Sequence, residues 1–166
     1  MDQDKVLYAI ENRCLYLKMT GAIRHLHCAS LDTLLREVTE QDQVDTFVVD
    51  LRQATYLDST SLGMIARMAR YMKKKSDDKL VLISINEDIN QILNSVQFGS
   101  VANIVEKWKN LPEQFFESEL FAKPIKSSRE MIIQSHKELA QINEDNRKKF
   151  TAVIESLEKK YKQKNK

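Results

Sequence analysis

The chain has 166 residues, 42% of them hydrophobic, with a net charge of +2 and only two cysteines. This length supports one domain with an ordinary core, and the lack of a run of about 18 apolar residues excludes a membrane-spanning helix. Because the first residues, Met1-Asp2-Gln3-Asp4, do not resemble a signal peptide, we expect a cytoplasmic protein whose Cys14 and Cys28 are free thiols.

The charge is unevenly distributed along the chain. Residues 1–121 carry 14 Lys and Arg against 18 Asp and Glu, whereas residues 122–166 carry 12 against 6. An acidic domain is therefore followed by a basic tail. The basic residues of this tail are mixed with acidic ones and few aromatic residues accompany them, so we expect no nucleic-acid partner. Because no apolar run is long enough to span a membrane, we expect no membrane partner either.

Strands and helices alternate along residues 1–108. Two short strands, at 5–10 and 14–20, flank a Glu11-Asn12-Arg13 turn and predict a hairpin. Helices are expected after caps at Ser30, at the Asp58–Ser61 cluster and at Asn86, the last one ending at Gly99. Strands are expected at 46–51, 79–85 and 101–105. The alternation predicts an α/β fold in which a hairpin precedes parallel strands with right-handed crossovers.

The remainder divides into a connecting segment, 109–126, and a helical extension, 127–166. Aromatic side chains between Pro112 and Pro124 predict a short helix packed on the domain; they are Phe115, Phe116 and Phe121. A capping box at Ser127–Glu130 opens one helix that runs to about residue 160. Its apolar stripe is interrupted by Asn143 and Asn146, which disfavours a coiled coil. Packing on its own domain, docking on a partner and pairing with a second copy all stay open.

The stretch from Val48 to Gly63 carries the chemistry. A buried strand leads through a loop to a helix N-terminus with four capping residues, Asp58, Ser59, Thr60 and Ser61. Such a terminus offers free backbone N–H groups and the positive end of the helix dipole, which suit an anion. A serine in this position is most often only a cap.

The same residues resemble a known signature. Asp58-Ser59-Thr60-Ser61-Leu62-Gly63, after Val48-Val49-Asp50-Leu51 and Tyr56-Leu57, is similar to the STAS domain, in particular to bacterial anti-sigma factor antagonists (anti-anti-sigma factors). In that family a partner serine kinase phosphorylates the serine directly after the aspartate, and Ser59 matches it. The family often has glycine at the position of Ser61, so Thr60 and Ser61 are secondary candidates. Thr20-Gly21-Ala22-Ile23 resembles a second family element, in which Arg24 replaces the usual acid.

The helix after Ser59 predicts a docking face. Gly63 costs about 0.5–1 kcal/mol relative to alanine in a helix, which indicates close approach by a partner or close internal packing. At 100° per residue, Met64, Met68 and Tyr71 point away from the stripe expected to face the sheet, beside Arg67. We therefore expect partner contacts, unless the C-terminal segment covers this face; the residues are Asp58, Gly63, Met64, Arg67, Met68 and Tyr71.

The resemblance implies a non-enzymatic regulator that binds an anti-sigma factor or switch kinase while Ser59 is unphosphorylated and releases it after phosphorylation. A metal-dependent serine phosphatase would reverse the mark. The alternatives are a structural STAS subunit of a membrane transporter complex, with Ser59 only a helix cap, and a small-ligand sensor. No cofactor is expected, and a homodimer through the C-terminal helix stays open.

Other candidate chemistry is weak. His25, His27 and Cys28 lack a fourth metal ligand at a recognised spacing. Neither a Gly-x-Ser-x-Gly motif nor an evident base accompanies Ser59, and no Gly-rich phosphate loop is present. We expect no metal site and no catalysis, and we assign His136 a packing role in the tail.

Overall fold

The computed structural model describes residues 3–118 and 128–164. The described strands form one six-stranded sheet in the order β5-β4-β3-β2-β1-β6. The strands are β1 (Lys5–Glu11), β2 (Cys14–Ile23), β3 (Thr46–Leu57), β4 (Leu80–Ile83), β5 (Ala102–Val105) and β6 (Phe116–Glu117). The helices are α1 (His25–Glu40), α2 (Ser59–Lys75), α3 (Glu87–Ser95), α4 (Ser128–Ala140) and α5 (Glu144–Lys164), with a 3-10 helix η1 (Phe98–Ser100).

The sheet is mixed, as the sequence predicted. The predicted hairpin is present, since β1 runs antiparallel to β2, and its turn residues Asn12 and Arg13 have φ angles of 51° and 60°. Such left-handed pairs match the twist of a two-residue hairpin turn. The β2–β3, β3–β4 and β4–β5 pairs are all parallel. The predicted α/β fold, with an N-terminal hairpin and parallel strands, is confirmed.

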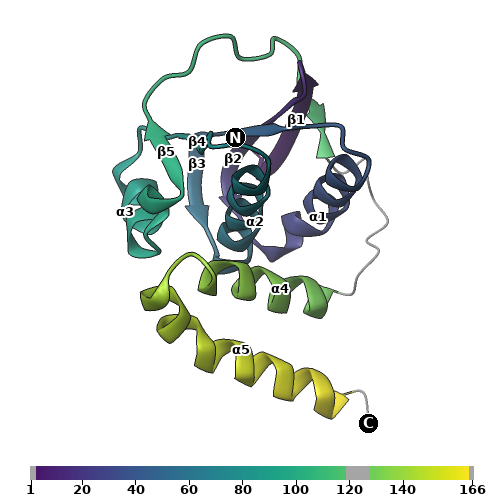
Figure 1. Ribbon diagram of the computed structural model, residues 1–166, viewed down its shortest axis with the longest axis vertical. Coiled ribbons are helices and arrows are strands. Elements are labelled where there is room, and N and C mark those ends of the chain that lie inside the picture. The colour runs from purple at the N-terminus through teal and green to yellow at the C-terminus, as the bar shows by residue number, and fades with distance from the viewer. Residues whose placement is uncertain (1–2, 119–127, 165–166) are drawn as a thin grey trace.

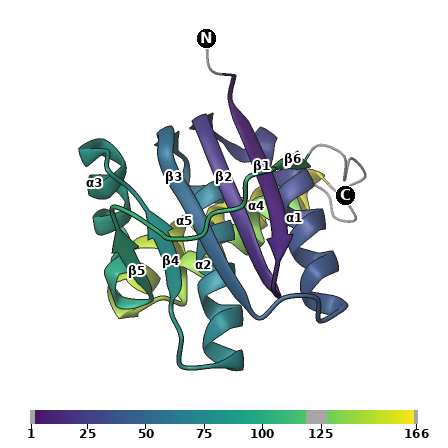
Figure 2. The same cartoon turned by 90° about the horizontal axis from the view of Figure 1, so that it is seen from above.

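The molecule is layered from the sheet outward. Helices α1, α2 and α3 cover one face of the sheet, α4 lies across α1 and α2 on the side away from the sheet, and α5 lies outside α4 (Figure 1). Inward side chains of β2, such as Leu15, Leu17 and Met19, are at most 1% exposed, as the two-residue period of a strand requires. The opposite face of the sheet is crossed by the chain between β5 and β6 (Figure 2). On this side Leu111 packs against a buried cluster that consists of Cys14, Val48, Val81 and Ile83.

Several element boundaries differ from the predicted ones. Helix α1 begins at His25, not after Ser30, because the chain turns directly out of β2. Strand β3 extends to Leu57, since it stays paired with β2 as far as Ile23. The chain leaves α3 through Gln97, whose φ is 56°, so the predicted cap at Gly99 is wrong. The connecting segment contributes strand β6 where a short helix was predicted, although residues 119–127 lie outside the described part.

The extension is two helices, and the prediction of one long helix is wrong. Asn143 Oδ1 accepts a hydrogen bond from the Asn146 backbone N–H, and Asn146 Nδ2 donates to the carbonyl groups of Val96 and Leu139. These bonds compete with a continuous helix at the residues that interrupt the apolar stripe. Met131 and Leu139 join the core of the domain, so α4 packs on its own domain. No described helix has the length and apolar character needed to cross a membrane.

Candidate functional site

Two helices begin side by side at the carboxyl ends of β2 and β3. Ile23 and Leu57 are paired in the sheet, and α1 and α2 start two residues after each. Between them, Asp58 Oδ2 accepts from the His25 backbone N–H at 2.7 Å and Oδ1 accepts from the Ser61 backbone N–H at 2.8 Å. One carboxylate therefore caps both helices, at the positive ends of their dipoles.

The three hydroxyl groups after Asp58 differ in access. Ser61 is 0% exposed, and its Oγ donates towards the main-chain oxygens of Asp58 and Ile23. Thr60 is 3% exposed. Ser59 is partly exposed, in the first position of α2. Of the three candidate acceptors, Ser59 alone reaches the surface of the described structure.

Ser59 has a hydrogen-bond partner that sequence reasoning missed. Its Oγ lies 2.8 Å from His136 Nε2, and His136 Nδ1 lies 2.7 Å from the Ile132 carbonyl oxygen. Because a carbonyl only accepts, Nδ1 carries a hydrogen, and in the neutral ring Nε2 accepts from the Ser59 hydroxyl. His136 is buried, as its assigned packing role implies, but it also contacts the candidate phosphosite. The two residues are 77 positions apart, so no sequence spacing predicts their contact.

A serine beside a histidine is also the arrangement of a nucleophile and its base. Hydrolysis would further need a substrate cavity at the serine. Two hollows of about 790 and about 590 Å³ are lined by neither Ser59 nor His136. Among the described residues, no group of three or more His, Cys, Asp or Glu is placed to hold a metal ion. The hydrogen bond joins α2 of the domain to α4 of the tail.

Gly63 lies where α4 crosses α2. An added Cβ at Gly63 would overlap the carbonyl oxygen of Ser135 and lie 2.6 Å from its Cα. Close internal packing, one of the two explanations offered by the sequence, accounts for this glycine. The other explanation, approach by a partner, is not needed while α4 is docked.

An ion pair with a buried carboxylate and a partly exposed guanidinium lies at the other end of this crossing. Arg70 Nε and Nη2 donate to the two Glu138 carboxylate oxygens at 2.7 and 2.6 Å, and Glu138 is 2% exposed. Hydrogen bonding to Glu138 raises the pKa of Arg70 above its ordinary value. Ser59, Gly63 and Arg70 are spaced by 4 and 7 residues, so they share one face of α2. We call these three residues the α4-facing stripe.

Two predicted docking residues are not exposed. Met64 and Met68 are 2% and 1% exposed and belong to the core, so the expectation that they lie on the surface is wrong. The reason is that α2 packs on three sides, against the sheet, α1 and α4. A helix covered on three sides has no free apolar face to offer.

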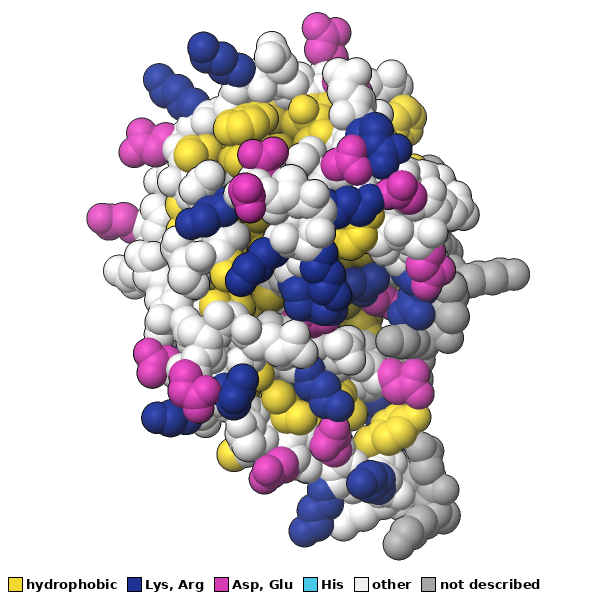
Figure 3. All heavy atoms as spheres, viewed as in Figure 1, with side chains coloured by type: hydrophobic (Ala, Val, Ile, Leu, Met, Phe, Trp, Pro, Cys, Tyr) yellow, Lys and Arg dark blue, Asp and Glu magenta, His cyan; other side chains and the backbone are white. Residues whose placement is uncertain are grey.

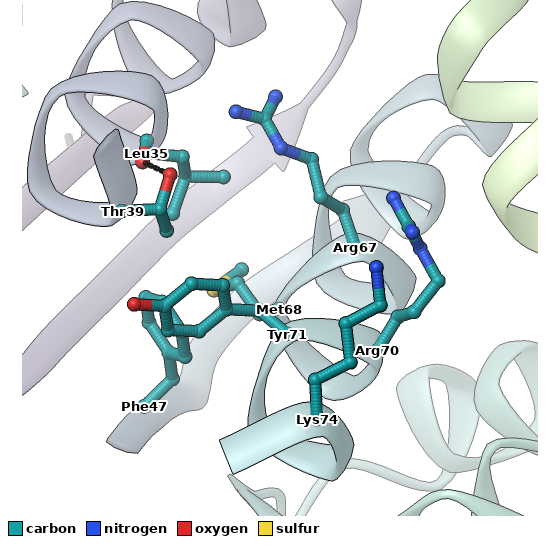
Figure 4. Close-up of a pocket in the computed structure, with 8 residues that line it drawn as sticks. All are labelled: Leu35, Thr39, Phe47, Arg67, Met68, Arg70, Tyr71 and Lys74. Atoms are coloured by element: carbon teal, nitrogen blue, oxygen red, sulfur yellow. Dashed lines mark hydrogen bonds between the residues drawn. The ribbon is translucent and has the colours of Figure 1, made fainter. Parts of the chain in front are cut away.

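Arg67 and Tyr71 lie at a hollow between α1 and α2. Arg67 Nη1 donates to Asp32 Oδ1 at 2.5 Å, and the Tyr71 hydroxyl donates to the Val44 carbonyl at 3.2 Å. The hollow has a volume of about 150 Å³, with Met68 among its lining residues (Figure 4). Figure 3 shows Lys and Arg side chains gathered over α2 in the middle of this face, and those at the hollow are Arg67, Arg70 and Lys74.

Exposed apolar side chains lie near the shared cap. Leu26, in the first turn of α1, is 77% exposed, and Tyr56, two residues before Asp58, is 43% exposed. The Arg24 guanidinium lies 5.3 Å from the centre of the Tyr56 ring, within cation–π range. Sequence reasoning missed Leu26 because it placed the start of α1 at Ser30.

A known protein family matches the part of the chain that forms β1 to β5 and α1 to α3. The model of the family described as "Mlab, STAS domain" matches residues 6–106. No curated protein matches the chain. Among solved structures, the chain is similar to the anti-sigma factor antagonist SpoIIAA in its unphosphorylated form, at 14% identity and a TM-score of 0.48, over 62% of this chain and 87% of that one. Helices α4 and α5 lie outside the family match.

Proposed function

The chain belongs to the STAS domain family, and we propose that it is a non-enzymatic regulator whose association with a partner is switched by phosphorylation of Ser59. The observation that carries this proposal is the placement of Ser59. Its hydroxyl is the accessible one of three, at the first position of α2 beside Asp58. Helix N-termini accommodate phosphate groups, and the start of α1 is held against the same carboxylate.

Phosphorylation would change the charge of this surface without dismantling the fold. A partner kinase transfers the terminal phosphoryl group of a nucleoside triphosphate to Ser59 Oγ, which loses its proton as the diphosphate leaves. The product carries a charge of about −1.5 to −2 at neutral pH. Two helix dipoles stabilise it there, whereas a protein partner that covers Ser59 would have to bury a dianion beside Asp58.

The partner we propose is an anti-sigma factor or its kinase, bound while Ser59 is unmodified. Asp58, Leu26 and Tyr56 supply a carboxylate and two exposed apolar side chains around the hydroxyl, and Arg67 and Tyr71 border the hollow on the α1 side. Gly63, Met64 and Met68 act from inside, by fixing the position of α2. A metal-dependent serine phosphatase would restore the binding form.

The test compares partner recovery among full-length variants expressed in the protein's own cells. Proteins bound to wild type, Ser59→Ala and Ser59→Asp are quantified by mass spectrometry, with Ser156→Asp as the control for added charge at an exposed site of α5. We expect Ser59→Ala and Ser156→Asp to recover as much partner as wild type. Ser59→Asp should recover at least tenfold less. Equal recovery with Ser59→Asp would contradict the switch.

A second function is favoured by one observation, the hydrogen bond that joins Ser59 to His136 of α4. In a structural STAS subunit of a membrane transporter complex, Ser59 would only help to start α2 and hold the tail. Such a subunit would copurify with membranes, and its Ser59 would carry no phosphate under any growth condition.

A further inference from the structure

We propose that α4 is a phosphorylation-sensitive cover of α2: a phosphate on Ser59 and the docked α4 exclude each other, so modification releases the C-terminal helices from the domain. This inference rests on the proposed function for the identity of the acceptor. The new claim is that the extension, residues 128–164, responds to phosphorylation of Ser59. Because the family match ends at residue 106, the response belongs to this chain's own extension.

Ser59 contacts α4 through the atom that phosphorylation would modify. Ser59 Oγ and His136 Nε2 are 2.8 Å apart, and an ester at Oγ removes the hydrogen on which their bond depends. His136 is 6% exposed, its Nδ1 is bonded to the Ile132 carbonyl, and its ring meets that of Phe150 at 6.1 Å between centres. Since the imidazole is held on all these sides, α4 itself has to move.

The rest of the interface resists a small adjustment. The Ser135 backbone already lies against Gly63 without space for a methyl group. At the other end, the bidentate pair of Arg70 and Glu138 needs its two parallel hydrogen bonds. Glu138 is buried, so a partial tilt that stretched this pair would leave its carboxylate without a cation, with only the hydrogen bond from Gln134 of α4 remaining. The helix is therefore expected to be either docked or released.

Charge acts in the same direction as shape. Asp58 already places a carboxylate next to Ser59, committed to two backbone N–H groups. A phosphate dianion on Ser59 under docked α4 would be desolvated beside that carboxylate, whereas it would be hydrated once α4 is released. Release would uncover the α4-facing stripe together with the core positions that Met131 and Leu139 occupy.

The coupling is reciprocal. If a phosphate on Ser59 weakens docking of α4 by some factor, docking of α4 disfavours the phosphorylated state at equilibrium by the same factor. Because the Ser59 hydroxyl is bonded to His136 while α4 is docked, we also expect a kinase to reach it more readily in the released population. Any ligand that holds α4 on α2 would keep the protein unphosphorylated.

The test uses the full chain with phosphoserine installed at position 59 during translation, compared with wild type by amide hydrogen exchange. The matched control carries phosphoserine at position 156, an exposed site on α5. We expect exchange in α4 to rise at least tenfold with phosphoserine at 59, while β2 and β3 keep their protection and the control matches wild type. Unchanged protection of α4 would overturn the proposal.

A second variant covers the case in which phosphoserine at 59 unfolds the whole chain. Ser59→Glu introduces one negative charge and a longer side chain at the same place. We expect amide exchange in α4 to rise in this variant while β2 and β3 keep their protection, and unchanged protection of α4 would overturn the proposal. Because the phosphate is installed and not supplied by a kinase, this test is separate from that of the proposed function. If Ser59 were never phosphorylated in cells, the proposed function would be wrong. The mutual exclusion of a phosphate on Ser59 and docked α4 could still be measured with the installed phosphoserine.

Discussion

The Ser59 hydroxyl and the His136 imidazole, 77 positions apart, are joined by a 2.8 Å hydrogen bond. Ser59 lies in the part of the chain that matches the STAS family, and His136 lies beyond it. The bond therefore links α2, inside the family match, to an extension that lies outside that match. A chemical change at the Ser59 hydroxyl therefore alters a contact of α4, and a movement of α4 alters access to Ser59.

The crossing of α4 over α2 makes a prediction about glycine. Gly63→Ala should push α4 from α2, because the new methyl overlaps the Ser135 backbone, and should lower the free energy of unfolding by about 1–3 kcal/mol. Gly99→Ala is the matched control, since an added Cβ there meets nothing within 4 Å, and should change stability by less than about 0.5 kcal/mol. Urea unfolding measures both, and equal effects would argue against the close contact.

Removing Arg70 and removing Glu138 from their ion pair should lower the stability of the protein by different amounts. Arg70→Ala leaves the Glu138 carboxylate, 2% exposed, without its cation, and should cost about 3–5 kcal/mol of stability. Glu138→Gln leaves Arg70, which is 41% exposed, free to be hydrated, and should cost about 1–2 kcal/mol. Thermal and urea unfolding of the two variants would show the difference. A larger loss for Glu138→Gln would mean that the burial of Glu138 is not what makes the pair costly to break.

The shared cap gives a third prediction. Asp58→Ala removes the acceptor for both α1 and α2, so it should cost about twice the ~1 kcal/mol of one cap. Asn86→Ala, which removes only the bond from the Asp88 backbone N–H at the start of α3, serves as the single-cap control. If both substitutions cost the same in urea unfolding, Asp58 does not support two helices.

The two cysteines should be inert in the folded protein. Burial raises the pKa of the Cys28 thiol, with further increases from Asp58 and Asp32, and burial also raises the pKa of Cys14. A raised pKa keeps the thiol protonated at pH 8, and the thiolate is the reactive form. Alkylation by iodoacetamide at pH 8 should be negligible until denaturant is added. Native labelling of either cysteine at the unfolded rate would contradict the described burial.

Local pattern predicted much of the fold. The hairpin, the parallel strands and the helix that begins at Ser59 follow from alternation, apolar runs and capping residues, all of which are encoded within a few positions. The start of α1 was missed because Arg24 is not a typical cap, whereas Ser30 is. The break near Asn143 was signalled only as an interruption of the apolar stripe.

The contacts at the site depended on information that spacing does not contain. Ser59 with His136 and Arg70 with Glu138 are pairs more than 60 positions apart, and no local rule selects such partners. The exposure assigned to Met64 and Met68 was wrong because a helical wheel assumes one buried side, whereas α2 is covered by the sheet, α1 and α4. Gly63 was the one local sign of this crossing.

The central claim, that Ser59 is a regulatory phosphoacceptor, is tested most directly by the intact mass of the protein purified from its own cells, with site mapping. Wild type is compared with Ser59→Ala across several growth conditions. We predict a species that carries one phosphate, mapped to Ser59 and absent from the variant. Wild-type protein that stays unmodified in every condition, or a phosphate that persists in Ser59→Ala, would contradict the claim.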